Sequence, residues 1–236
     1  MDIPIVEAAS PYNEQIEALD KMVGAQHRRE TLKDSSGASM MDPKTQVSKI
    51  HSTSILDASM KTFEANLVFA LTRLYPCEYG EKIANIVLNM YVNQHNQPTL
   101  LAAEAARENG NSPNTVVSSA VAIVGKKMVQ KAMDASNALL ELFQFTKLGG
   151  SKEAFDYTDQ LKEADKFKDA LLADGEDPCA GILADCLNKA GDSVFIKFVQ
   201  DFAAANGGKL STDVLFAAVW VTLGWEALRT KKISKY

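Results

Sequence analysis

Apolar residues recur three or four positions apart between Pro113 and Leu148, a spacing that predicts a helix with one continuous apolar face. Ser112 is a suitable helix cap and Pro113 suits a first helical position, so the start signal is strong. The apolar stripe consists of Val117, Val121, Val124, Met128, Ala132, Ala135, Leu139, Leu142 and Phe143. We expect the rest of the chain to pack around this stretch.

The central stretch is too long to remain unbroken in a compact chain of this size. A helix over 113–148 would extend about 54 Å, whereas a compact chain of this length is roughly 45 Å wide. Either the helix breaks, or the protein is elongated. We favour a break or kink near Gly125.

Similar periodicity predicts helices along most of the chain. The clearest begins after Ser54, with Asp57 in the capping-box position, and its apolar stripe is Leu56, Met60, Phe63, Leu67, Leu71 and Leu74. The remaining predicted helices cover about 12–29, 78–94, 99–109, 151–174, 178–190, 192–205 and 211–228. Two valine-rich segments, 115–124 and 214–223, could be strands by propensity alone, but both have helical spacing. The sequence therefore predicts an all-α fold, an irregular multi-helix bundle of about nine helices with an extended N-terminal arm.

Polar composition separates the N-terminal segment from the rest. Residues 31–53 are rich in Ser, Thr and Asp and include Gly37 and Pro43, which predicts a long loop. We therefore predict an arm with one helix and a polar linker (1–53), a helical body (54–228) and a basic tail (229–236). The apolar residues predicted to make oligomer contacts in the arm are Ile3, Ile5, Val6, Ile16 and Leu19.

Composition is that of an ordinary globular protein, with 46% hydrophobic and 23% charged residues among 236. No run of 18 apolar residues occurs, and the N-terminus lacks the basic segment of a signal peptide. The three cysteines form no CxxC pair, which favours a reducing compartment. We expect a chain without a membrane span, located in the cytoplasm or in a virion.

The search for catalytic motifs yields no site. There is no Glu-x-x-His pair and no Cys/His cluster with zinc spacing, so neither metal site nor cofactor is predicted. The segment 207–212, GGKLST, superficially suggests a phosphate loop. It lacks the first glycine of that motif, and Leu210 separates Lys209 from Ser211. A glycine helix stop followed by a serine cap explains this segment better.

Local basic patches make nucleic acid a candidate partner despite the net charge of −5. The candidate contact residues are Lys126, Lys127, Lys131, Arg229, Lys231 and Lys232. Solvated helix faces and a solubilising tail remain the more common explanation for such residues.

An arm, a helical body and a basic tail favour a non-enzymatic, self-assembling structural protein, most concretely a viral or phage capsid or nucleocapsid-type subunit. We expect a homo-oligomer with protomer contacts through the arm. One alternative is a helical adaptor that binds a basic protein through the acidic stretch 152–177. Another is an enzyme with a pocket between the 54–94 helices and the central stretch, using Glu64, Tyr91 or Glu141. The scarcity of histidines and glycine-rich loops favours a non-enzymatic protein, and no residue pattern identifies a family.

Overall fold

The computed structural model describes residues 39–41, 48–51, 53–92, 97–145, 161 and 164–233. The chain divides into two compact units, residues 1–73 and residues 74–236, and each is treated separately below. Most of the described chain is helical, which confirms the all-α prediction. The predicted helix over 12–29 and the five predicted oligomer-contact residues of the arm lie outside the described residues.

The first unit contains a small antiparallel sheet followed by two helices. The sheet order is β1-β2-β3, with Ser39 opposite Ile50 and Lys49 opposite Ser54. Part of the segment predicted to be a loop therefore forms strands. The elements are β1 (Ser39–Met41), β2 (Ser48–Ile50), β3 (Thr53–Ser54), α3 (Ile55–Ala58) and α4 (Phe63–Thr72).

The single helix predicted after Ser54 is wrong, because a second cap interrupts it. Ser54 accepts a hydrogen bond from the Asp57 N–H, as expected, but Thr62 accepts one from the Ala65 N–H and starts a new helix. The restart changes which face is buried. The predicted stripe includes the exposed side chains Leu56, Met60, Phe63 and Leu71, whereas the buried residues of α3 and α4 are Ala58, Ala65, Val68, Phe69 and Thr72.

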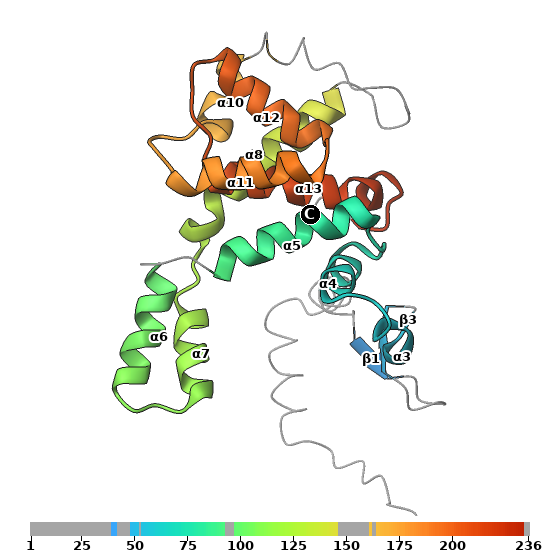
Figure 1. The fold of residues 1–236 in the computed structure, drawn as a ribbon, viewed down its shortest axis with the longest axis vertical. Helices are drawn as coiled ribbons and strands as arrows, with labels where there is room; N and C mark the ends of the chain where they lie inside the picture. The colour runs from blue at the N-terminus through green and yellow to red at the C-terminus, as the bar shows by residue number, and fades with distance from the viewer. Residues whose placement is uncertain are drawn as a thin grey trace, which may run out of the picture. The chain divides into compact units, whose positions relative to one another are not determined.

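The second unit is built around one buried helix, α13 (Thr212–Arg229). Residues 214–219 of this helix are all buried, and α13 packs against α8, α12, α5 and α11 (Figure 1). Phe198 and Phe202 of α12 and Leu139 of α8 complete the same core. The other helices of the unit are α5 (Glu78–Val92), α6 (Pro98–Glu108), α7 (Pro113–Ala122), α8 (Lys126–Phe145), α10 (Ala164–Leu171), α11 (Pro178–Ala190) and α12 (Val194–Ala205).

The break near Gly125 is confirmed, since α7 ends at Ala122 and α8 begins at Lys126. The two halves of the predicted stripe have different environments. Ala135, Leu139 and Leu142 are buried in the core, as predicted. Val117 and Val121 are instead 63% and 64% exposed, so the expectation that the whole stripe forms the core is wrong for α7.

Side chains cap the starts of both α11 and α13. Asp177 accepts a hydrogen bond from the Cys179 N–H at the start of α11, and Ser211 accepts one from the Val214 N–H at the start of α13. Gly207 has φ +59°, the left-handed conformation expected where a helix stops. The segment 207–212 is therefore a helix stop and a cap. Among the described helices, none combines the length and the apolar character needed to cross a membrane.

Candidate functional site

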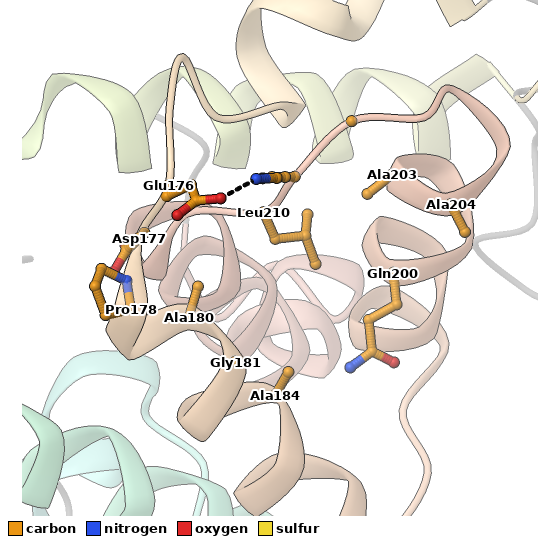
Figure 2. Close-up of a pocket in the computed structure, with 12 residues that line it drawn as sticks. Glu176, Asp177, Pro178, Ala180, Gly181, Ala184, Gln200, Ala203, Ala204 and Leu210 are labelled. Carbon is orange, nitrogen blue, oxygen red and sulfur yellow. Dashed lines mark hydrogen bonds and ion pairs between the residues drawn. The ribbon is translucent and has the colours of Figure 1, made fainter.

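A cavity of about 580 Å³ lies in the second unit between α11, α12 and the segment that connects α12 to α13 (Figure 2). This volume is within the usual range of ligand pockets. The cavity is lined by Glu176, Asp177, Pro178, Ala180, Gly181, Ala184, Gln200, Ala203, Ala204, Gly208, Lys209 and Leu210. We refer to it as the α11–α12 pocket.

Small side chains create the α11–α12 pocket. Ala180 and Ala184 are four residues apart and therefore share one face of α11, with Gly181 beside them. Ala203 and Ala204 line the opposite wall from α12 (Figure 2). A Cβ atom at Gly181 would meet no atom within 4 Å apart from its chain neighbours and the nearby backbone of its own helix. The two helices thus leave space between them, and Gly181 borders its open part.

Charged groups lie only at the rim. Lys209 forms an ion pair with Glu176, whose carboxylate is labelled in Figure 2; both residues line the pocket and both side chains are well exposed. Exposed ion pairs contribute at most about 1 kcal/mol. An anionic ligand could therefore recruit Lys209 at small cost. Gln200, on the α12 wall, donates its amide hydrogen to Asn188 Oδ1 at 3.1 Å.

Asp177 connects the starts of two helices at this rim. Its Oδ1 accepts from the Cys179 N–H of α11 at 3.0 Å, and its Oδ2 accepts from the Thr212 N–H of α13 at 2.6 Å. Burial alone would raise the pKa of this carboxyl, but the N–H donors of Thr212, Cys179 and Ala180 together outweigh burial. The pKa of Asp177 is therefore below its ordinary value. The Thr212 hydroxyl also lowers this pKa from nearby, although its geometry is not that of a hydrogen bond.

Asp213 has the opposite electrostatic character. Burial raises the pKa of its carboxyl, and repulsion from Asp177 raises it further, while Lys131 partly opposes both effects. Lys131 also donates from Nζ to the Asp169 backbone carbonyl at 2.5 Å. Two neighbouring carboxyls with pKa values shifted in opposite directions are a pattern found at sites of acid–base chemistry, although structural networks produce it too.

The residues predicted to contact nucleic acid have mixed environments. Lys131 is held by Asp169, and Arg229 donates twice to Glu226, at 2.9 and 2.6 Å. The other four, Lys126, Lys127, Lys231 and Lys232, are exposed. Nucleic-acid binding stays a prediction that the described contacts do not support further.

The enzyme pocket considered from the sequence stays a prediction. Glu141 forms an ion pair with Lys166 at 2.6 Å, Glu64 lies in the first unit, and the side chain of Tyr91 is outside the described part. Sequence reasoning missed the α11–α12 pocket because small apolar residues carry no chemical signature. Within the described residues, no group of three or more His, Cys, Asp or Glu side chains could hold a metal ion.

Comparison with known proteins gives one informative structural likeness. No family model and no curated protein matches the chain. The structure is similar to that of citryl-CoA lyase from Hydrogenobacter thermophilus, with a TM-score of 0.59 and 18% sequence identity, over 81% of this chain and 80% of that chain. At this identity the likeness shows a shared fold.

This likeness contradicts the function predicted from the sequence. A capsid or nucleocapsid-type subunit was inferred from the arm, the helical body and the absence of catalytic motifs, yet the same helical architecture occurs in an enzyme. The capsid and virion assignments are therefore wrong, whereas the adaptor alternative stays an untested prediction. The reasoning failed because few histidines and few glycine-rich loops are compatible with a helical enzyme fold.

Proposed function

We propose that this chain is an enzyme that acts on a thioester of coenzyme A, and that the α11–α12 pocket receives part of that substrate. The observation that carries the proposal is the fold shared with citryl-CoA lyase along 81% of the chain. Because one fold can host several functions, the assignment also has to agree with the chemistry of the pocket.

The lining of the pocket suits this class of ligand. Coenzyme A combines a flexible arm of low polarity with several phosphate groups. The pocket offers an apolar surface formed by Pro178, Leu210 and several alanines, with the ammonium group of Lys209 at its rim. The arm would lie against the apolar wall, and Lys209 would exchange Glu176 for a phosphate or a carboxylate of the ligand.

A proton-holding group is also present near the pocket. Lyase chemistry requires a group that accepts or returns a proton. Asp177 is poorly suited, because both of its oxygens accept backbone hydrogen bonds. Asp213 retains its proton to higher pH than an ordinary aspartic acid, so it is our candidate for this role.

The first test is calorimetric titration with coenzyme A combined with a chromatographic assay of citryl-CoA consumption. Gly181→Phe fills the pocket at a position with open space around it, and Ile182→Phe places the same ring on an exposed neighbour outside the lining. We expect binding and turnover by the wild type, at least tenfold weaker binding by Gly181→Phe, and a change of less than twofold in Ile182→Phe.

The possible results separate the two parts of the proposal. Binding without consumption of any coenzyme A thioester tried, including acetyl-CoA, would overturn the enzymatic part. Absence of binding by the wild type would overturn both parts. Equal weakening by the two phenylalanine variants would show that the ligand binds outside the α11–α12 pocket.

A further inference from the structure

Helices α6 and α7 form a hairpin with unusually little buried surface. None of the residues of these two helices is buried. They pack against one another through small groups, and the Ser119 hydroxyl donates to the Ala102 carbonyl at 3.3 Å. The residues half-buried within the two helices are Thr99, Ala102, Ala103, Ala106, Val116, Ser119 and Ala120.

The outer side of the hairpin carries an apolar stripe. Val117 and Val121 are 63% and 64% exposed, and Val124 is 53% exposed. Val117 and Val121 are four residues apart and therefore share one side of α7, and Val124 lies in the turn that follows this helix. Leu100 and Leu101 of α6 are also exposed. We call Val117, Val121 and Val124 the valine stripe.

Such helices are not expected to be stable without a further partner. Helices of 10 or 11 residues are marginal in water, and most of their stability in proteins comes from burial of an apolar face. Surface apolar residues are ordinary when they are scattered, but here they form a stripe on a helix with no buried residue. The valine stripe therefore requires a covering surface.

We infer that a second copy of this chain covers the valine stripe, so that two α6–α7 hairpins pair around a twofold axis as a four-helix bundle. The charge pattern supports a second copy as the occupant. Residues 109–125 contain no charged side chain, so the α7 helices of two copies can meet without repulsion between like charges, with the charged residues Glu104, Arg107 and Glu108 of α6 beside this contact. A twofold contact requires such a self-complementary patch, and paired helical hairpins are an established bundle arrangement.

The available area is compatible with a dimer of modest affinity. An 11-residue helix is about 16 Å long, and two adjacent helices are roughly 20 Å wide. The apolar side chains Met128, Val129 and Met133 of α8 are also exposed, after the exposed Lys126 and Lys127 that begin this helix. Standard interfaces bury about 800 Å² per partner. The hairpin surface is at or below that size, which is typical of weak or transient contacts, and we expect a dissociation constant in the micromolar range.

The test is sedimentation velocity of the full chain over a range of concentrations. The variant Val117→Glu/Val121→Glu places two acids on the valine stripe. The matched control Ser118→Glu/Ala122→Glu places two acids with the same spacing at exposed positions on another face of α7. We expect the wild type and the control to dimerise with dissociation constants within about threefold, and the valine variant to remain monomeric.

Several results would overturn this inference. A wild type that stays monomeric at high micromolar concentration would overturn it. If the valine variant also unfolded more easily in that case, another part of the same chain would cover the valine stripe. A dimer that survives both valine substitutions would place the contact elsewhere, for example in the predicted arm. Circular dichroism checks that the valine variant remains helical. If the valine variant unfolds, the milder Val121→Ser variant replaces it, and the inference requires Val121→Ser to raise the dissociation constant of the dimer at least fivefold.

Discussion

At the residue scale, Asp177 organises the rim of the α11–α12 pocket. One carboxylate accepts hydrogen bonds from N–H groups that are 33 residues apart in the chain, those of Cys179 and Thr212. The Ala173 N–H also donates to the Lys209 carbonyl at 2.7 Å, which links the same two connecting segments. The polar groups at the mouth of the pocket are thus held by the backbone contacts that start α11 and α13.

Replacing Asp177 with Asn should destabilise the protein. The amide has one acceptor oxygen where the carboxylate has two, so one helix start loses its partner. We expect a decrease of about 1–2 kcal/mol in the free energy of unfolding, the usual range for a lost cap. Urea unfolding measures it, and Asp185→Asn, at an exposed position on α11, should change the value by less than about 0.5 kcal/mol.

The same substitution should change the response to acid. Folding lowers the pKa of Asp177. The contribution of this carboxylate to the free energy of unfolding is therefore fully present above the unfolded-state pKa of about 3.9. This contribution is lost as the pH falls through the folded-state value. The difference between wild type and Asp177→Asn should therefore shrink on acidification, and a difference that grew would contradict the assigned role.

Asp213→Asn should have the opposite effect at neutral pH. Folding raises the pKa of this carboxyl, so its charged form is disfavoured in the folded state. Removing the charge should increase the free energy of unfolding by a few tenths of a kcal/mol, and the gain should disappear below both pKa values. Unfolding at neutral and acidic pH tests this, and a lower stability of Asp213→Asn at neutral pH would show that the electrostatic attraction of Lys131 dominates.

Lys209→Glu should weaken the binding of an anionic ligand. The substitution replaces the ammonium group at the rim with a carboxylate beside Glu176, so repulsion takes the place of attraction. We expect coenzyme A to bind at least tenfold more weakly in low salt. Lys197→Glu makes the same charge change at an exposed position of α12 outside the lining. Similar losses in the two variants would indicate a general charge effect.

At the element scale, helix ends are better predicted than helix faces. Ser54, Ser112 and Ser211 cap helices as the sequence indicates, because a cap depends on a few adjacent residues. The face buried by α4 was predicted incorrectly, because Thr62 restarts the helix and shifts its phase. The valine stripe shows a related limit, since periodicity identifies an apolar face without identifying what covers it.

The difference between predicted and observed faces can be tested with two phenylalanines. Phe198 is fully buried among α12 and α13, whereas Phe63 is 70% exposed in the first unit. We expect Phe198→Ala to lower the free energy of unfolding by about 3–5 kcal/mol. Phe63→Ala should change it by no more than about 0.5 kcal/mol. Calorimetric unfolding of both variants checks this, and a large loss for Phe63→Ala would mean that another surface covers this ring.

At the scale of the whole molecule, the proposed pocket and the proposed dimer surface use different helices. The pocket is formed by α11 and α12, and the valine stripe belongs to α7 and the turn that follows it. Loss of dimerisation in the valine variant should therefore leave coenzyme A binding in place, and filling the pocket at Gly181 should leave dimerisation in place. The two proposals can fail separately.

The sequence predicted the fold class better than it predicted the function. The all-α class follows from periodicity that extends over most of the chain, whereas the pocket arises from alanines and glycines that come together only in the folded unit. The absence of familiar catalytic motifs was interpreted as evidence for a structural protein. The fold shared with citryl-CoA lyase shows that this interpretation gave too much weight to missing motifs.

The most direct test of the central claim is a titration of the isotope-labelled chain with coenzyme A, followed by amide chemical shifts in NMR spectra. The account predicts shift changes concentrated at Gly181, Gln200 and Gly208, three residues that line the α11–α12 pocket, and absent from these positions in Gly181→Phe. Shift changes confined to other helices, or no changes at millimolar coenzyme A, would contradict the assignment of this pocket to a coenzyme A thioester.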